Sequence, residues 1–431
     1  MMIIILPLVL LAQIAKAQDA PTILELNLLN DTFGLYYTSL SMGTPPTLIS
    51  VSIDTGSDLN WIKCSPCFDC GDTMSNSRLF MPFKSSTFGV VECTTNHSCP
   101  AGYVESTGSK ISCAQSAVPH ICIHKYGYED GSMTTGYLFR DMLTMETLSA
   151  AVAASSAGND SQVEDQLVFG CGIINTGLEA NNNASGILGL SRGPLSIVSQ
   201  LSLKIFSYCM PNRAHTTNVT GYLVLGDSHP QLPGKPLHYT PMLHDNMAGS
   251  PTSIFYYLEV TGISINSMLL DIPTSAFALS SDGQSGGTLL DSGTSFTTLV
   301  DEAYTVMEKA FVAAMDPMLV MVSIGNEITC YAVPPSQKGL LVAPRITFHL
   351  ANMLDLHQST DQTLHIDQDA SDATHDVYCL AYRNAGPFGT GQALNIFGNH
   401  QQQGLHIEVD IAGSRLGFAT SPTNCDYANT N

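Results

Sequence analysis

One short motif occurs twice in this chain of 431 residues. The segment Ser-Ile-Asp-Thr-Gly-Ser ends at Ser57, and the segment Leu-Leu-Asp-Ser-Gly-Thr ends at Thr294. In each copy an apolar run typical of a β-strand leads into the aspartate. Each copy is also followed, much further along the chain, by two apolar residues and a glycine, at Ile187–Gly189 and Ile396–Gly398. A repeat of this kind predicts two related halves that each supply one aspartate.

Paired Asp-(Thr/Ser)-Gly turns are suited to acid–base chemistry on a water molecule. Glycine permits a tight turn, so Asp54 and Asp291 can be held rigidly just after their strands. Two carboxylates about 3 Å apart cannot both ionise, and such a pair shares one proton. The ionised member can take a proton from water while the protonated member hydrogen-bonds a carbonyl under attack. We therefore expect Asp54 and Asp291 to be catalytic, with no metal or cofactor.

The neighbours of the two aspartates are expected to support them. The hydroxyls of Ser57 and Thr294 can donate to the outer carboxylate oxygens. The hydroxyls of Thr55 and Ser292 can reach across and lock the two turns together. With the two glycines, the expected supporting residues are Thr55, Gly56, Ser57, Ser292, Gly293 and Thr294.

Short apolar runs separated by Gly and Pro, such as Leu35–Met42, dominate the rest of the chain. Helical periodicity is rare, and its best example is Asp301–Met315, where Asp301 is placed to cap the helix. Its apolar face is expected to contain Ala303, Met307, Phe311 and Ala314. The pattern predicts a mostly β protein with few helices. Two polar segments, Ala150–Gln162 and Leu354–His375, are expected to be solvated surface loops.

The charge composition restricts the partners. The net charge is −21, from 37 Asp plus Glu against 16 Lys plus Arg. Nucleic acid binding needs clustered basic residues, which we do not find, so no nucleic acid partner is expected. Few cations also mean little positive self-repulsion once the carboxylates protonate, which suits work at acid pH. Beyond the N-terminus no run is apolar enough to span a membrane.

The N-terminus resembles a secretion signal. Met1–Ala12 is almost entirely apolar, and Ala15–Ala17 has the small-x-small pattern of a cleavage site. We expect cleavage after Ala17 and secretion to the extracellular space or apoplast, with the vacuole as the alternative destination. Residues 18–34, which contain no Lys or Arg, would then form a short N-terminal or pro region.

Twelve cysteines agree with export, because an even count in a secreted chain predicts disulfides. We expect the following to be oxidised: Cys64, Cys67, Cys70, Cys93, Cys99, Cys113, Cys122, Cys171, Cys209, Cys330, Cys379 and Cys425. The alternative is a zinc cluster, in the run Cys64–Cys70 or in the run His120–His124. Sequons that fit surface glycosylation begin at Asn30, Asn96, Asn159, Asn183 and Asn218.

Longer motifs surround the aspartates. They are Gly43-Thr44-Pro45-Pro46, Asp54–Trp61, Cys64–Cys70, Asp130-Gly131-Ser132, Phe169–Gly172, Gly186–Ser196, Phe206–Cys209, Asp291–Thr294 and Gly398–Gln403. Over Leu35–Cys425 the chain resembles the pepsin-like aspartic proteases, most closely the plant nepenthesin-type branch. The resemblance implies a monomeric endopeptidase that cuts polypeptides at acid pH, with a cleft between two pseudo-twofold-related β lobes. It also implies that Cys64–Cys122 is a disulfide-bonded insertion.

On this resemblance the chain divides into five parts. They are a signal peptide at 1–17, the short pro region at 18–34, an N-terminal lobe at 35–213, a C-terminal lobe at 214–425 and a tail at 426–431.

The resemblance further implies a β-hairpin flap over the cleft. Counting back from Asp130, Gly131 and Ser132 makes Tyr128 the flap tyrosine, whose hydroxyl can bond the indole N–H of Trp61. Tyr126 is the alternative flap residue. At position 129, where the family usually has Gly, this chain has Glu.

Two other functions compete with this interpretation. Gly189–Gly193 matches the G-x-S-x-G elbow of serine hydrolases, although that fold needs alternating strands and helices. Relatives with the aspartic protease fold also include catalytically inactive inhibitors of glycosidases. Those relatives typically have one damaged Asp motif, whereas both motifs are intact here.

Overall fold

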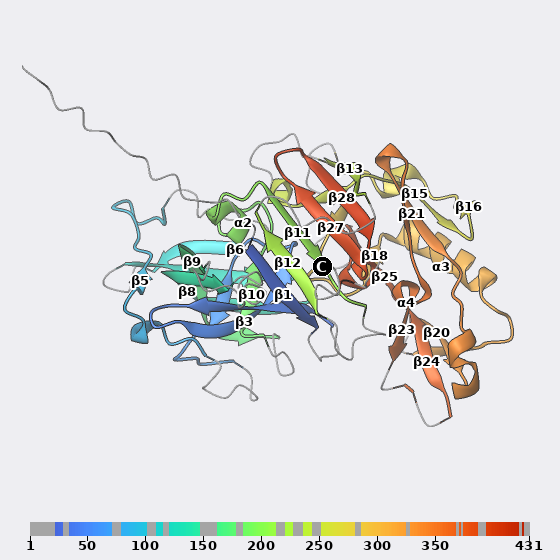
Figure 1. The fold of residues 1–431 in the computed structure, drawn as a ribbon, viewed down its shortest axis with the longest axis horizontal. Coiled ribbons are helices and arrows are strands. Elements are labelled where there is room, and N and C mark those ends of the chain that lie inside the picture. Colours follow the sequence, from blue (N-terminus) through green and yellow to red (C-terminus); the bar gives the residue numbers. More distant parts are fainter. Residues whose placement is uncertain are drawn as a thin grey trace, which may run out of the picture.

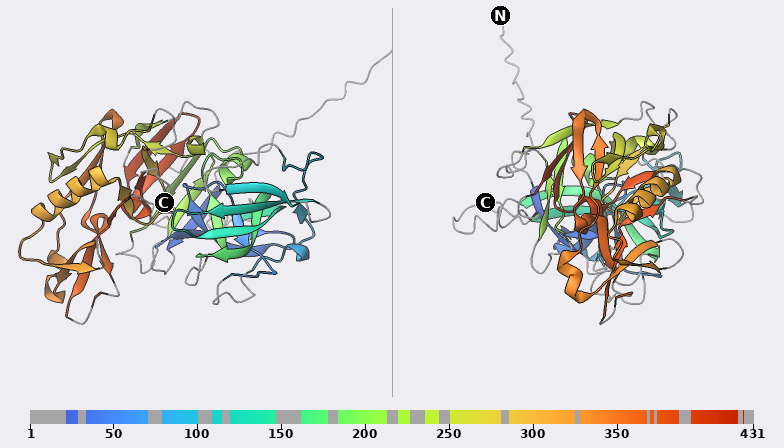
Figure 2. Two further views of the ribbon diagram at one scale, coloured as in Figure 1. Left: turned by 180° about the vertical axis from the view of Figure 1, so that it is seen from behind. Right: turned by 90° about the vertical axis from the view of Figure 1, so that its right-hand side faces the viewer.

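In the computed structural model, the chain is described over residues 22–28, 34–70, 79–100, 109–114, 120–146, 162–177, 184–212, 220–226, 236–243, 251–280, 286–324, 328–367, 370–371, 374–386, 394–421 and 425. Strands dominate, as predicted, and the described helices are few and short apart from one of 14 residues. Figure 1 shows the N-terminal and C-terminal halves side by side, and Figure 2 shows the same division from behind.

The N-terminal half contains β1 (Thr22–Leu28), β2 (Tyr36–Met42), β3 (Thr47–Asp54), β4 (Trp61–Lys63), β5 (Gly89–Val90), β6 (Ser109–Ala114), β7 (Ile121–Gly127), β8 (Met133–Glu146), β9 (Gln162–Thr176), β10 (Gly186–Gly189), α2 (Ile197–Gln200), β11 (Ile205–Cys209) and β12 (Gly221–Leu225).

The C-terminal half contains β13 (His238–Leu243), β14 (Tyr257–Leu258), β15 (Val260–Ile265), β16 (Met268–Leu269), β17 (Thr288–Leu290), β18 (Thr297–Leu299), α3 (Asp301–Ala314), β19 (Val320–Ile324), β20 (Ile328–Val333), β21 (Ile346–Leu350), β22 (Leu354–His357), α4 (Thr360–Thr363), β23 (Leu364–Asp367), β24 (Asp376–Leu380), β25 (Tyr382–Asn384), β26 (Asn395–Phe397), α5 (Asn399–Gln402), β27 (Leu405–Asp410) and β28 (Arg415–Thr420).

A shared antiparallel sheet joins the two halves (Figure 1). Its strands run in the order β1, β12, β11, β27, β28 and β13, so β11 of one half pairs directly with β27 of the other. The disulfide Cys209–Cys425 also connects the halves. The order is symmetric about the pair β11–β27, which agrees with the repeat in the sequence.

The same local arrangement recurs around each aspartate. β3 runs parallel to β10, with Asp54 opposite Gly189. β17 runs parallel to β26, and the N–H of Asp291 donates to the carbonyl of Phe397 at 3.2 Å. The two apolar-apolar-Gly segments noted in the sequence are therefore the strands that hold the two Asp turns.

One sequence-based expectation was wrong, and one strand was not predicted. Thr22–Leu28, within the segment assigned to a short N-terminal or pro region, forms strand β1 and pairs with both β12 and β2, while that assignment stays a prediction. The segment Leu354–His375, expected to be a loop, contains β22, α4 and β23, and the Ser359 side chain caps α4 in a capping box with Gln362.

The helix predicted at Asp301–Met315 is α3. Ala303, Met307 and Phe311 are buried on its apolar face as expected, whereas Ala314, predicted on the same face, is exposed. The cap of α3 differs, because Val300 is the N-cap residue and Asp301 lies in the first turn. The signal peptide, most of the loop Ala150–Gln162 and the lobe boundary between residues 213 and 214 involve residues outside the described ranges and remain predictions.

Candidate active site

Asp54 and Asp291 face one another where the two halves meet. Asp54 is the last residue of β3, and Asp291 directly follows β17. Both are largely buried, with 6% and 7% of their surfaces exposed. The turn of Asp54 is held by the pairing of β3 with β10, and the turn of Asp291 by the pairing of β17 with β26. The two carboxylates therefore meet although β3 and β17 are far apart in the sequence.

Hydrogen bonds cross between the two turns in matching pairs. The N–H of Thr55 donates to the Ser292 hydroxyl at 3.0 Å, and the N–H of Ser292 donates to the Thr55 hydroxyl at 2.9 Å. The Thr55 hydroxyl in turn donates to the carbonyl of Leu290, and the Ser292 hydroxyl to that of Ile53. These bonds form the cross-link that the sequence predicted, and they are buried, so movement of one turn relative to the other would leave polar groups unsatisfied.

Each carboxylate also accepts hydrogen bonds from its own turn. The Ser57 hydroxyl donates to Asp54 Oδ2, and the Thr294 hydroxyl donates to Asp291 Oδ2 at 2.6 Å. The backbone N–H two residues after each aspartate, in Gly56 and Gly293, donates to its Oδ1 at 2.8 Å. Both aspartates are thus oriented by one hydroxyl and one amide.

The two turn glycines are required by close approach. A Cβ added at Gly56 would lie 2.7 Å from Cγ of Asp291, and one added at Gly293 would lie 2.4 Å from Oδ1 of Asp54. Each half therefore packs its glycine backbone against the aspartate of the other half. No larger residue fits at either position without displacing a carboxylate.

Burial raises the pKa of the Asp54 carboxyl well above its usual range, and the neighbouring charge of Asp291 raises it further. Hydrogen bonds from Ser57 and Gly56 act in the opposite direction but are smaller effects. A hydrogen bond between the two carboxyl groups also favours the protonated form of Asp54. The pair is thereby arranged to hold one proton.

The hairpin of β7 and β8, here called the flap, carries its turn at Tyr128–Ser132. The Tyr128 N–H donates to the Ser132 carbonyl at 2.9 Å, and the Ser132 N–H donates to Asp130 Oδ1 at 2.8 Å. Gly131 has a φ of +83°, a conformation that glycine adopts without strain.

The hydrogen bond expected at the flap tyrosine is present. The Trp61 indole N–H donates to the Tyr128 hydroxyl at 2.7 Å. The alternative residue, Tyr126, is buried against Tyr128, with ring centroids 5.0 Å apart. Glu129 is exposed at the turn.

Some side chains behind the aspartates carried no predicted role. The Gln402 side chain donates to the carbonyl of Asp291 at 3.0 Å and accepts from the Tyr208 hydroxyl at 2.8 Å. The Asn399 side chain donates to the carbonyl of Ser292 at 3.1 Å. All three residues lie in motifs noted in the sequence, but their contacts link segments too distant in the chain to be inferred from spacing.

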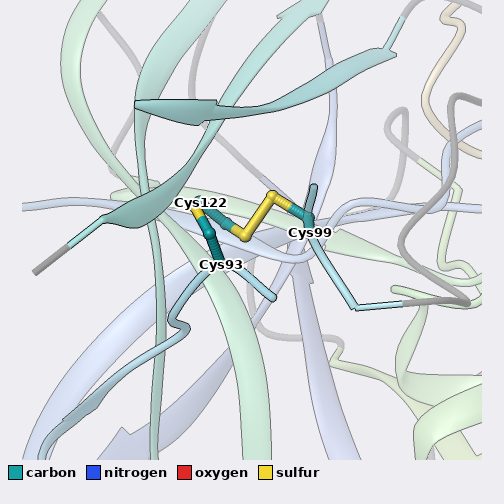
Figure 3. Close-up of side chains that lie close together, drawn as sticks. All are labelled: Cys93, Cys99 and Cys122. Carbon is teal, nitrogen blue, oxygen red and sulfur yellow. A yellow bond between two sulfur atoms is a disulfide. The ribbon is translucent and has the colours of Figure 1, made fainter. Parts of the chain in front are cut away.

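All twelve cysteines lie within the described residues and form six disulfides, which confirms the prediction of full oxidation. The pairs are Cys64–Cys171, Cys67–Cys70, Cys93–Cys113, Cys99–Cys122, Cys209–Cys425 and Cys330–Cys379. The sulfur atoms of Cys93, Cys99 and Cys122 gather within 4.8 Å (Figure 3). Each of them belongs to a disulfide, so these sulfurs are not thiolates that could bind zinc.

The G-x-S-x-G match has no features of a serine nucleophile. Ser191 is fully buried, and its hydroxyl accepts a hydrogen bond from the N–H of Gly193. Among the sequons, Asn96 is exposed, whereas Asn30, Asn159, Asn183 and Asn218 lie outside the described residues, so glycosylation remains a prediction. In the described part of the chain, no helix is both long and apolar enough to cross a membrane.

The mostly β fold, with its strand-held Asp turn in each half, defines the class of pepsin-like aspartic protease folds. The solved structure of basic 7S globulin from soybean shares this fold, with a TM-score of 0.67 and 20% identity over 94% of this chain and 98% of that one. Conglutin gamma, a basic 7S globulin from lupine seeds, matches with a TM-score of 0.66 over 94% of this chain and 98% of that one, at 20% identity.

Two family models cover most of the chain. The model described as xylanase inhibitor N-terminal matches residues 36–227, and the one described as xylanase inhibitor C-terminal matches residues 255–420. The chain is 32% identical to aspartic proteinase nepenthesin-2 of Nepenthes gracilis, over 91% of this chain and 78% of that protein. It is 31% identical to nepenthesin-1 of the same plant, over 90% and 78% respectively. The chain belongs to the nepenthesin-type family of plant aspartic proteases.

Proposed function

We propose that this chain is an active aspartic endopeptidase that works at acid pH through Asp54 and Asp291. The observation that carries the proposal is the paired set of turns, in which both carboxylates keep all their supporting hydrogen bonds. A site that had lost catalysis would be free to lose one aspartate, one hydroxyl or one glycine. Here Gly56 and Gly293 still leave the room that opposing carboxylates need.

The pair carries one proton in the working state, and burial favours that proton on Asp54. The ionised carboxylate takes a proton from a water molecule, and the water oxygen attacks the carbonyl carbon of the substrate. The protonated carboxyl gives its proton to the carbonyl oxygen, which produces a tetrahedral diol. Collapse of the diol breaks the C–N bond, a proton passes to the leaving nitrogen, and the pair is left with one proton.

The substrates are polypeptides bound in an extended form. An extended segment beneath the flap gains backbone hydrogen bonds, and its alternate side chains enter apolar pockets. The Tyr128–Trp61 hydrogen bond holds the flap where it excludes water from the reacting carbonyl. We therefore expect cleavage between large apolar residues.

The place of work is the secretory route, ending in the extracellular space or apoplast, with the vacuole as the alternative destination. Six disulfides support this part of the proposal, because disulfides form and persist in oxidising compartments. We expect the working form to be a monomer, because one chain supplies both aspartates and no second copy is needed to complete the site.

Cleavage of a denatured protein across about pH 2–8, with and without pepstatin, tests the proposal. We expect a maximum between about pH 2.5 and 5.5, where such pairs hold one proton, and loss of cleavage with pepstatin. Asp54→Asn and Asp291→Asn should each abolish cleavage while the variants stay folded. Asp141→Asn is a matched control, because Asp141 is also buried and accepts from the hydroxyls of Ser85 and Thr87. A maximum at pH 7 or above, or activity in either dyad variant, would reject the mechanism.

A second candidate is a binding protein that inhibits glycosidases. The xylanase inhibitor descriptions of both matching family models favour it. A xylanase activity assay with added protein separates the two candidates. Inhibition that persists in Asp54→Asn, together with no proteolysis by the unmodified chain, would support the inhibitor.

A further inference from the structure

A small disulfide loop docks on the strand beside the flap. The loop Cys67–Cys70, here called the CFDC loop, follows β4 and is closed by the Cys67–Cys70 disulfide. The N–H of Phe68 donates to the carbonyl of Ile173 at 2.8 Å, and the N–H of Asn175 donates to the carbonyl of Asp69 at 2.7 Å. Phe68 itself is 77% exposed. The loop therefore lies at the surface while its backbone is fixed to β9.

The Asn175 side chain contacts the disulfide itself. Its amide nitrogen lies 3.3 Å from the Cys70 sulfur and 3.7 Å from the Cys67 sulfur. Its amide oxygen accepts a hydrogen bond from the Thr134 hydroxyl at 2.7 Å. His124 Nε2 in turn lies 3.4 Å from the same hydroxyl. Thr134 is on β8 and His124 is on β7, so this chain of contacts reaches both strands of the flap.

The polar chain is entirely enclosed between the disulfide and the flap. Asn175, Thr134 and His124 are all buried, and burial lowers the pKa of His124 to about 3. His124 thus stays neutral over most of the acid range. A Cβ added at Gly172 would lie 2.4 Å from the amide oxygen of Asn175, so the neighbouring backbone leaves this side chain little freedom. The contacts hold one arrangement, because a buried amide that loses its partners is costly.

Strand β9 contacts the strands on both sides of the Tyr128–Trp61 hydrogen bond. It pairs with β8 of the flap and, in parallel, with β4, where Trp61 lies opposite Gly170. The β8–β9 register shifts between Thr135 and Gly136, opposite Ile174 and Gly172, so Ile173 is the extra residue of a bulge. The CFDC loop binds this bulge, and bulges re-aim the strand that follows. The loop is therefore connected through β9 both to β4, which carries Trp61, and to β8 of the flap.

Chain entropy gives little reason for this disulfide. Its cysteines are three residues apart, whereas the other five pairs are separated by 20 to 216 residues. A disulfide stabilises a fold less as the loop that it closes becomes shorter. Both of its cysteines are also partly exposed, which attack by an external thiolate requires, whereas Cys330 and Cys379 are buried.

We propose that Asn175 is a positioning residue for the flap and that the Cys67–Cys70 disulfide is a thiol-sensitive site that governs this positioning. The inference rests on the proposed function for its kinetic readout but not for its spectroscopic one. A dithiol is the reductant: one thiolate attacks a sulfur of the pair, forms a mixed disulfide and releases the other cysteine as a thiolate. The second thiol of the reagent then displaces the remaining cysteine. The reagent leaves as a cyclic disulfide, and the protein gains two thiols.

Fluorescence of Trp61, the only tryptophan in the chain, reports on the flap directly. Tyr128→Phe, which removes the acceptor of the indole N–H, defines the emission of the broken hydrogen bond. Asn175→Ala is expected to shift the emission toward that of Tyr128→Phe. Asn175→Asp, which loses the N–H donors but keeps an acceptor for Thr134, is expected to lie between. Asn395→Ala is the matched control, because Asn395 is a buried amide of the C-terminal half with comparable hydrogen bonds, and we expect no shift.

The kinetic readout separates positioning from general loss of structure. In Asn175→Ala we expect kcat to fall about 10-fold while KM changes less than about 2-fold, because flap alignment matters most in the transition state. Unaltered emission together with unaltered kcat in Asn175→Ala would overturn the positioning role. If Asn175→Ala shifts the emission but the unmodified protein shows no proteolysis, the proposed function is rejected. The positioning role of Asn175 is then still supported by the emission.

Partial reduction of the unmodified protein needs no variant. The protein is exposed to a dithiol at neutral pH, alkylated and mapped by mass spectrometry. We expect Cys67 and Cys70 to be labelled first, with the Trp61 emission shifting in proportion, while the buried pair Cys330–Cys379 stays intact. Labelling of other cysteines first would overturn the thiol-sensitive site. Labelling of Cys67 and Cys70 without a change in emission would overturn its link to the flap, and this result decides the question even if the Asn175 variants fail to fold.

Discussion

Replacing Asp54 by Asn is expected to change how the stability of the protein depends on pH. Asp54 is buried and faces Asp291, and both effects raise the pKa of its carboxyl above the ordinary value of 3.8. Between these two pKa values, the native chain holds a proton at this site that the unfolded chain has released. By linkage, the stability of the unmodified protein must fall as the pH rises through this window.

The size of the effect follows from the proton count. One proton held only by the native state lowers the free energy of unfolding by about 1.4 kcal/mol for each pH unit. For a chain of this length, that decline corresponds to about 2 °C in Tm per pH unit. Asn does not titrate, so Asp54→Asn lacks this term. From about pH 4 upward, the Tm of Asp54→Asn should rise relative to that of the unmodified protein. This difference in Tm should stop growing once the pH exceeds the raised pKa of Asp54.

Thermal unfolding followed by circular dichroism from pH 3 to pH 8 measures this difference. Other titrating groups contribute to both proteins and cancel. Asp291→Asn is the control: it removes the charge opposite Asp54 but leaves Asp54 buried, and burial is the larger cause of the shift. Its pH dependence should therefore lie between those of the other two proteins. Parallel Tm curves for the unmodified protein and Asp54→Asn would refute the raised pKa and the shared proton with it.

Three further results are expected. Tyr128→Ala should lower kcat by about 10- to 100-fold, and Tyr126→Ala should lower it less. Equal, small effects would mean that the Tyr128–Trp61 hydrogen bond does not align the flap for catalysis. Gly293→Ala should cost at least about 100-fold in kcat, because the added Cβ would lie 2.4 Å from Oδ1 of Asp54; near-normal turnover would contradict this packing. Thiol titration of the denatured, unreduced protein should find no free cysteine, and any reactive thiol would contradict the six disulfides.

The dyad turns were predictable from the sequence because their determinants are local. An apolar strand, an aspartate, a hydroxyl residue and a glycine set the turn within a few positions, and the repeat identified the partner. Trp61 and Tyr128 were located through the resemblance to a known family, not through any pattern in the chain. The supporting contacts of Tyr208, Asn399 and Gln402 join distant segments, and one sequence does not contain that information.

Two departures from the sequence analysis have specific physical causes. The strand at Thr22–Leu28 was not predicted, although its residues alternate apolar and polar as in a half-buried strand, because the segment was considered only by its position beside the signal peptide. Leu354–His375 is rich in Asp and His, which suggested solvent. Its short strands each bury only a few residues, such as Leu356 and Leu364. They are held in place mainly by backbone hydrogen bonds to the neighbouring strands.

Disulfide pairing could not be predicted, since twelve cysteines allow too many combinations. From the spacing alone, one cannot tell that Cys67 pairs with Cys70 while Cys64 pairs with Cys171, 107 residues further along the chain. The difference depends on β9, which passes beside β4 and brings Cys171 next to Cys64.

The pairing of β11 with β27 has a consequence for synthesis. The ribosome releases β11 long before β27 exists, so one side of β11 emerges with its backbone N–H and C=O groups unpaired. Such an open strand edge is a template for pairing with other chains. The nascent N-terminal half therefore keeps this open edge until β27 has been made, and only after that can Cys209 meet Cys425.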